Sequence, residues 1–152
     1  MEFSDQEKAL LREIQQDGAA SLATLAERVG MAQSTLWRKL QEFEAAGVIT
    51  ARVALLDPAK VGAKLCVFAL VSINDHSEAS VAGFARLVGL HPEILECHAV
   101  TGTADYILKI RTRDVESYER FMTHTLLRSE VVRSVQSSFS LKALKQSTVL
   151  PL

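Results

Sequence analysis

The sequence predicts an α+β protein with two domains: three short helices in a helix-turn-helix arrangement, followed by a βαββαβ domain. Three observations support this fold class. Up to residue 50, apolar residues recur at helical spacing. Turn-forming residues then interrupt the chain from Asp57 to Gly62. Beyond them, apolar strand segments alternate with helical segments. We therefore expect residues 1–50 to form the first domain, 51–62 a strand and linker, and 63–152 the second domain.

The three N-terminal helices are marked by capping residues and closing glycines. Ser4-Asp5-Gln6-Glu7 has the form of a capping box. Ser21 can cap the second helix, and Gly30 ends it. The third helix follows within about three residues, and Gly47 closes it. Two helices joined by a tight, glycine-containing turn are typical of a helix-turn-helix, and the weak alternation from Arg52 to Leu56 predicts a short strand, as in a winged variant.

The exposed side of the third helix predicts contact with DNA. No Asp or Glu occurs between Met31 and Gln41, and the polar side chains there can bond base edges and phosphates. An ordinary solvated face is the alternative, and for Trp37 a core or dimer contact is equally open. Residues 1–50 hold five Lys or Arg and eight Asp or Glu, so the prediction rests on local placement of positive charge. The expected DNA contacts are Gln33, Ser34, Thr35, Trp37, Arg38, Lys39 and Gln41.

The second domain alternates strands and helices in the order βαββαβ. The predicted strands are Leu65 to Ile73, Ile94 to Thr101, Tyr106 to Thr112 and Val131 to Leu141. One helix, within 78–88, would bury Val81, Phe84, Ala85 and Val88, and the other, capped by Asp114, would bury Val115, Tyr118, Phe121, Met122 and Thr125. This order is that of the ferredoxin-like fold, which by itself implies no activity. It leaves one face of a sheet rich in Val, Ile, Leu and Phe uncovered, so we expect dimerisation through that face.

Several classes of function lack support in the sequence. The longest apolar run, Leu65 to Val71, is too short to cross a bilayer, and no export signal is visible, so we expect a cytoplasmic protein. Cys66 and Cys97 form no C-x-x-C pair, and the four histidines have no metal-binding spacing, so we expect neither metal nor cofactor. The loop from Asn74 to Glu78 is acidic and lacks the Gly and Arg of a phosphate-binding hydrolase loop. We predict no catalytic residue and no enzyme activity.

A helix-turn-helix, a linker and a βαββαβ domain in this order resemble the Lrp/AsnC, or feast/famine, family of transcription regulators. The resemblance covers essentially the whole chain. Four stretches carry it: Leu25 to Gly30 (LAERVG), Phe43 to Ile49 (FEAAGVI), Ala54 to Pro58 (ALLDP) and Glu96 to Tyr106 (ECHAVTGTADY).

The resemblance implies a sequence-specific, nucleoid-associated DNA-binding dimer that assembles to tetramers or octamers. It also implies an amino-acid effector, bound between dimers at the loop joining the second and third strands. Asp105 would then hold the α-ammonium group, and Gly102 would let backbone N–H groups approach the carboxylate. On pattern alone, a plain hairpin turn is the favoured interpretation of this loop, and the resemblance reverses that preference. The implied effector positions are Thr101, Gly102, Thr103, Ala104, Asp105, Tyr106, Ser137 and Ser138.

The chain departs from the family pattern in places. Ala32-Gln33 stand where relatives often have Ser then Pro, and loss of a capping side chain costs about 1 kcal/mol. Lys39 stands where Arg is common, which keeps the charge but loses bidentate geometry. The tail from Ser137 to Leu152 resembles the branch that includes cysteine-responsive regulators, which implies cysteine or a related small amino acid as effector. A ligand-independent architectural protein that compacts DNA is the alternative function.

Overall fold

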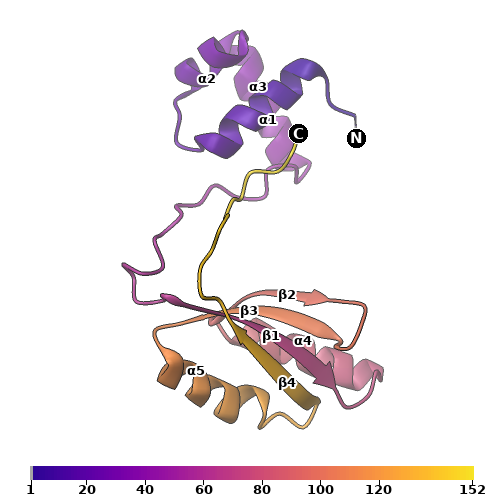
Figure 1. Ribbon diagram of the computed structural model, residues 1–152. Coiled ribbons are helices and arrows are strands. Elements are labelled where there is room, and N and C mark those ends of the chain that lie inside the picture. Colours follow the sequence, from indigo (N-terminus) through magenta and orange to yellow (C-terminus); the bar gives the residue numbers. More distant parts are fainter. Residues whose placement is uncertain (1) are drawn as a thin grey trace. The chain divides into compact units, whose positions relative to one another are not determined.

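The computed structural model describes residues 2–152 (Figure 1). The chain divides into two compact units: the first ends at Leu55 and also contains Leu144–Leu152, and the second comprises Leu56–Ala143. The boundary lies near the expected one. The final segment makes its contacts with the first unit, because Gln15 and Arg12 of the first helix bind the backbone of Leu150 and Leu152, respectively. None of the helices in the described residues has the length and apolarity of a membrane span.

The N-terminal unit contains α1 (Asp5–Gln16), α2 (Leu22–Val29) and α3 (Gln33–Ala45). The capping box is confirmed: the Ser4 hydroxyl accepts from the Glu7 N–H, and the Glu7 carboxylate accepts from the Ser4 N–H. The Ser21 hydroxyl caps α2 by accepting from the Thr24 N–H, and Gly30 ends the helix with a φ of 64°. Ala32 occupies the N-cap of α3 and has no side chain that could accept a hydrogen bond, as the sequence indicated.

Apolar residues from all three helices form the core of this unit. Burying one such side chain stabilises the folded state by about 1.5–3 kcal/mol. The buried set is Leu10, Leu11, Ile14, Leu25, Ala26, Leu36, Leu40 and Phe43. Because Leu36, Leu40 and Phe43 fix one side of α3 against α1 and α2, its opposite side remains at the surface.

The second unit is a four-stranded antiparallel sheet with two helices on one face (Figure 1). The strands are β1 (Leu65–Ile73), β2 (Ile94–Ala99), β3 (Tyr106–Thr112) and β4 (Val132–Phe139), in the spatial order β2-β3-β1-β4. The helices are α4 (Glu78–Leu90) and α5 (Val115–Phe121), the latter extended by the π-helical turn η1 (Met122–Leu126). The predicted ferredoxin-like βαββαβ fold is confirmed.

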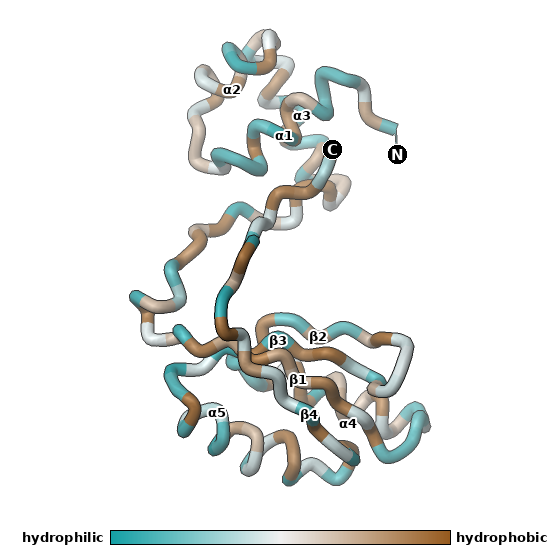
Figure 2. Tube along the Cα trace, in the orientation of Figure 1, coloured by the Kyte–Doolittle hydropathy of each residue, from teal (hydrophilic) through white to brown (hydrophobic). Residues whose placement is uncertain are grey.

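Strand alternation separates the core of this unit from an uncovered face. In β1, which is mostly apolar along its length (Figure 2), Val67, Ala69, Val71 and Ile73 point toward the helices and pack with Phe84 and Tyr118, among others. The opposite side of the sheet is called the open face here. It consists of Cys66, Phe68, Leu70, Ser72, Glu96, His98, Ile107, Lys109, Arg111, Ser134, Gln136 and Ser138. The large apolar residues on it are Phe68, Leu70 and Ile107, so it is less apolar than we expected, because most Val, Ile and Leu side chains face the helices.

The expected strand at Arg52 to Leu56 is not formed in the part of the chain that the structure describes. A strand is stabilised by hydrogen bonds to a neighbouring strand, and Val53, Leu55 and Leu56 are largely exposed in this single chain. The prediction of a short wing strand is therefore wrong for this chain on its own.

The buried stripes of both helices in the second unit also differ from the prediction. In α4, Val81 and Ala85 are exposed, and Phe84, Leu87 and Val88 face the sheet. Both stripes have helical spacing, but Gly83 lets α4 come close to the residue that precedes β4: a Cβ at Gly83 would lie 3.3 Å from the Val131 side chain. Val115, in the first turn of α5, is likewise exposed.

Candidate DNA-binding and effector sites

The side of α3 that faces away from the core presents most of the predicted DNA-contacting residues. Gln33, Ser34 and Thr35 lie in the first turn and are exposed. Arg38 and Gln41 are exposed on the following turns, and Trp37 is 54% exposed, so it lies outside the core of this unit. Polar side chains at the start of such a helix are well placed to reach base edges in the major groove.

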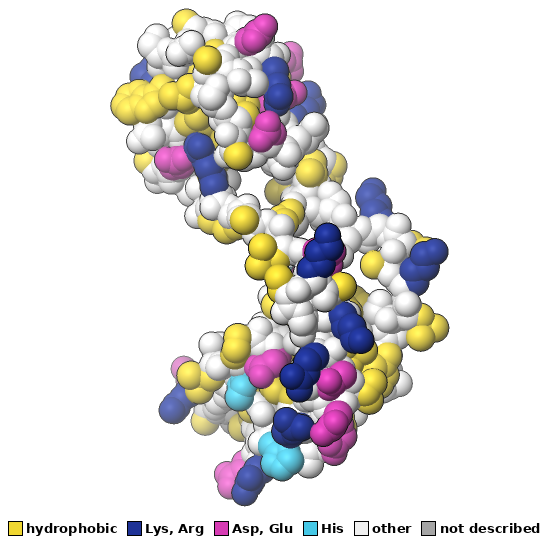
Figure 3. Space-filling view, turned by 90° about the vertical axis from the view of Figure 1, so that its left-hand side faces the viewer, with side chains coloured by type: hydrophobic (Ala, Val, Ile, Leu, Met, Phe, Trp, Pro, Cys, Tyr) yellow, Lys and Arg dark blue, Asp and Glu magenta, His cyan; other side chains and the backbone are white. Residues whose placement is uncertain are grey.

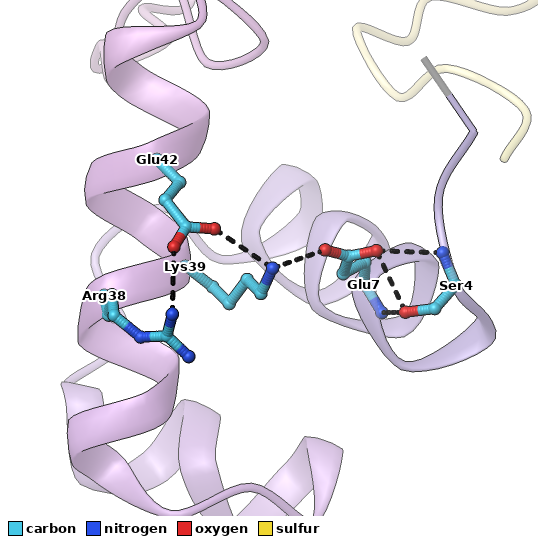
Figure 4. Close-up of polar contacts among 5 residues, drawn as sticks. All are labelled: Ser4, Glu7, Arg38, Lys39 and Glu42. Carbon is cyan, nitrogen blue, oxygen red and sulfur yellow. Dashed lines mark hydrogen bonds and ion pairs between the residues drawn. The ribbon is translucent and has the colours of Figure 1, made fainter.

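Lys39 differs from its neighbours because intramolecular carboxylates hold it (Figure 4). Its side chain is only 27% exposed, and its Nζ lies 2.9 Å from Oε1 of Glu7 and 3.0 Å from Oε2 of Glu42. Glu7 also completes the capping box with Ser4. Lys39 therefore links α3 to the beginning of α1, a positioning role that the sequence interpretation missed.

The same network perturbs two pKa values. The Lys39 ammonium group and the N–H and hydroxyl of Ser4 lower the pKa of Glu7 to about 2. Hydrogen bonds to Glu7 and Glu42 raise the pKa of Lys39 above its ordinary value. Both groups are therefore ionised at neutral pH. The Lys39–Glu42 contact spans i to i+3, a spacing that brings side chains together on a helix, so the sequence contained a signal for it.

Arg38 is also bound to Glu42. Its Nη1 lies 3.3 Å from Glu42 Oε1, at i to i+4 spacing, with the Arg38 and Glu42 side chains 65% and 45% exposed. Both basic residues of α3 thus have acidic partners within the chain. On the face shown in Figure 3, basic and acidic side chains also lie near one another in each unit.

The loop between β2 and β3 lies where the resemblance placed the effector. Thr101, Gly102 and Thr103 are exposed, and Ala104 is half-buried. Gly102 has a φ of 124°, a conformation that residues with a side chain rarely adopt. The Val100 N–H donates to the Asp105 carbonyl over 2.9 Å, and the Asp105 N–H donates to the Val71 carbonyl over 3.0 Å. The loop is thereby attached to β1.

Both carboxylate oxygens of Asp105 have partners in the chain. Oδ2 accepts from the Ile73 N–H over 2.9 Å, and Oδ1 lies 2.8 Å from Nε2 of His76. Both bonds lower the pKa of Asp105, and the bond from the Ile73 N–H has the larger effect. Asp105 is therefore ionised at neutral pH. The Asp105 side chain is 24% exposed and His76 71%, so Oδ1 faces a partner that can move into solvent. Sequence spacing gave no sign of His76, because only the fold brings it to Asp105.

The remaining predicted effector residues lie away from the exposed part of the loop. Tyr106 stacks on Phe84 in the core, with 4.5 Å between ring centroids. The Ser137 hydroxyl shares a hydrogen bond with the Tyr118 hydroxyl on the helix side of the sheet. Ser138 lies on the open face opposite Phe68. Ser137 pairs with Ala69 and Ser138 with Phe68, two and three residues before Val71, whose carbonyl accepts from the Asp105 N–H.

The two cysteines are both free thiols in the second unit. Cys66 is buried, and Cys97 is half-buried, where burial raises the pKa of its thiol. Within residues 2–152, no three His, Cys, Asp or Glu side chains are grouped so that they could hold a metal ion.

Comparisons with known proteins agree with the order of the two units along the chain. A family model described as a winged helix-turn-helix DNA-binding domain matches residues 3–50, and one described as the Lrp/AsnC ligand binding domain matches residues 66–150. A glutamate uptake regulatory protein of Zymomonas mobilis is 35% identical over 91% of this chain and 84% of its own length. The DNA-binding transcriptional activator DecR of Escherichia coli is 32% identical over 96% of each chain.

Solved structures show the same two-unit fold. A transcriptional regulator from Neisseria meningitidis, in complex with L-methionine, has a TM-score of 0.95 and 35% identity, covering 99% of this chain and 97% of that one. An AsnC family transcriptional regulator from Agrobacterium tumefaciens has a TM-score of 0.93 and 34% identity, covering 98% and 97%. With a DNA-binding helix-turn-helix and a ligand-binding domain matched in order, this chain belongs to the Lrp/AsnC family of transcription regulators.

Proposed function

We propose that this regulator contacts DNA through α3 and responds to an amino acid bound at the Thr101–Tyr106 loop. The observation that carries the effector assignment is the ionised, partly exposed carboxylate of Asp105, fixed by the Ile73 N–H beside the exposed Gly102. An α-amino acid offers an ammonium group for that carboxylate. It also offers a carboxylate that backbone N–H groups can bind where a glycine permits positive φ.

The names of relatives support the amino-acid class. One relative regulates glutamate uptake by its name, and one solved relative is in complex with L-methionine. From the resemblance of the tail, we propose cysteine as the first candidate. L-methionine is the natural comparison, because it shares the backbone groups and differs in side-chain length.

DNA recognition on this proposal uses the first turns of α3. Gln33, Ser34 and Thr35 would reach base edges, and Arg38 would reach the phosphate backbone. The exposure of all four side chains supports this placement. Lys39 would act mainly by holding α3 against α1, since two carboxylates bind its ammonium group.

Assembly is proposed to begin at the open face. Phe68, Leu70 and Ile107 form an apolar centre with a polar rim, a composition typical of a dimer interface. We propose a homodimer through this face that assembles further to a tetramer or octamer in the cytoplasm, associated with the nucleoid. Pairing of this kind would leave both helix-turn-helix units available for one two-fold symmetric operator.

A thermal-shift screen with each of the twenty amino acids tests the effector assignment. At about one hundred times its dissociation constant, a bound ligand stabilises the protein by about 2.7 kcal/mol, which raises the melting temperature by about 5–10 °C. The amino acid that gives a shift is then added to gel shifts with genomic fragments. If no amino acid raises the melting temperature, the effector assignment is refuted, and the alternative function, a ligand-independent architectural DNA-binding protein, takes its place.

A further inference from the structure

Glu42 is the shared acidic partner of both basic residues on α3. Its Oε1 lies 3.3 Å from Nη1 of Arg38, and its Oε2 lies 3.0 Å from Nζ of Lys39 (Figure 4). The two contacts are not equivalent. Lys39 has a second carboxylate, Glu7, at 2.9 Å, whereas the acidic partner of the exposed Arg38 is Glu42.

A phosphate group would bind the same guanidinium group of Arg38 that Glu42 already contacts at Nη1. Carboxylates and phosphates both accept hydrogen bonds from a guanidinium group, and Arg binds either with high geometric specificity. A DNA phosphate at Arg38 must therefore displace the Glu42 carboxylate or lie beside a like charge. Either way, the contact yields less free energy than a contact made by an unpaired arginine.

We propose that Glu42 limits the affinity of this regulator for DNA by competing with backbone phosphates for Arg38. The inference rests on the proposed placement of α3 on DNA. Phosphate contacts contribute equally on every sequence, whereas base contacts contribute only at the operator. A carboxylate that weakens the phosphate contact therefore lowers non-specific binding and leaves the discrimination to base contacts by residues such as Gln33, Ser34 and Thr35.

The charge balance of the N-terminal unit is consistent with this role. Residues 1–50 hold five basic and eight acidic side chains, a composition opposite to that of most DNA-binding domains. The alternative role for Glu42 is base reading, because a carboxylate can accept a hydrogen bond from the amino group of cytosine. The two roles predict opposite effects when the charge of Glu42 is removed.

The experiment compares Glu42→Gln with Glu13→Gln in the full-length protein, by fluorescence anisotropy on an operator fragment and on random-sequence DNA. Glu13 is a matched control, because it lies in the same unit on α1 and pairs with Arg28 at 3.4 Å. For Glu42→Gln, we expect binding to random DNA to tighten by about threefold to tenfold. The slope of the logarithm of the binding constant against the logarithm of the salt concentration should become steeper by up to about one. In an Arg38→Ala background this gain should disappear, as a double-mutant cycle requires. Circular dichroism melts confirm that each variant is folded, with Glu42→Met as a second uncharged variant.

Two results would overturn the proposal. Weaker operator binding by Glu42→Gln would mean that Glu42 reads a base, and equal tightening by Glu13→Gln would mean that only net charge matters. A separate result tests the proposed placement of α3 on DNA. If Arg38→Ala alone leaves the affinity for DNA unchanged, α3 does not contact phosphates through Arg38.

Discussion

Substitution of Asp105 by Asn tests the proposed effector site most directly. The change keeps the size of the side chain and an oxygen that can accept from the Ile73 N–H, so the attachment of the loop to β1 is retained. It removes the negative charge and places an amide in the region of Oδ1, where His76 now lies. The change therefore isolates the charge of Asp105 from its structural bond.

The expected loss follows from the strength of a charge-assisted hydrogen bond. Bonds between ionised partners are roughly twice as strong as neutral ones, and loss of one lowers affinity by about tenfold to a hundredfold. The lowered pKa of Asp105 means that wild-type protein keeps this charge throughout the neutral range. Isothermal titration calorimetry with the amino acid identified by thermal shift should give a dissociation constant weaker by that factor.

Two further variants make the measurement specific. Asp114→Asn makes the same chemical change at the N-cap of α5, where Asn is an equally good cap, and should leave effector affinity unchanged. His76→Ala removes the residue that the ammonium group would displace, and should tighten binding by a few-fold. The proposed site is refuted if Asp105→Asn binds the amino acid as tightly as wild type, since the loop is then only a turn.

Four other predictions test separate parts of the structure. Arg38→Ala should weaken operator binding in gel shifts by about tenfold, with an unchanged melting temperature; unchanged affinity would exclude this face of α3. Gly102→Ala should reduce effector binding, because a residue with a side chain at a φ of 124° costs about 1–3 kcal/mol of backbone strain, although no atom blocks the added Cβ. An unchanged effector affinity would show that the loop conformation is unimportant for binding. Phe68→Asp on the open face should convert the assembly to monomers in light scattering, whereas Val115→Asp on exposed α5 should not; the opposite result would place the interface at the helices. The depressed pKa of Glu7 contributes stability that is present above its ordinary pKa of 4.5 and is lost as the pH falls toward about 2, so melts of Glu7→Gln should depend less on pH in that range than wild type.

The sequence predicted the fold well because local signals and tertiary packing agree. Ser4, Ser21 and Asp114 are caps in the sequence and caps in the structure. β1 and β3 have their predicted ends, since an apolar strand between turns has few other ways to bury its side chains. The wing strand at Arg52 to Leu56 failed because it has no neighbouring strand in the single chain, and the buried stripe of α4 was mispredicted because two stripes have the same periodicity. The predicted and observed stripes of α4 share Phe84 and Val88, and the close approach of Gly83 to Val131, which is far along the chain, cannot be foreseen from local spacing.

The candidate sites were predicted less completely than the fold. Their residue types were recognisable from patterns along the chain, but the partners of those residues come from elsewhere in the fold. Lys39 was predicted from its exposed neighbours to contact DNA, yet Glu7 on α1 binds it. Asp105 was predicted to be available to a ligand, yet Ile73 and His76 occupy its oxygens. Ser137 was placed at the effector site by resemblance, and spacing along the chain gave no sign of the Tyr118 hydroxyl that shares a hydrogen bond with it.

The two candidate sites share a physical principle that fits a regulator. On our proposals, a phosphate at α3 either displaces Glu42 from Arg38 or lies beside its charge, and an ammonium group at the loop displaces His76 from Asp105. In both places, binding is an exchange of one partner for another, so the net affinity is a small difference between two similar terms. Each 1.4 kcal/mol by which the competing partner opposes binding weakens the dissociation constant by about tenfold. On our proposals, the intramolecular carboxylate at one site and the histidine at the other keep each interaction weak enough to be reversed.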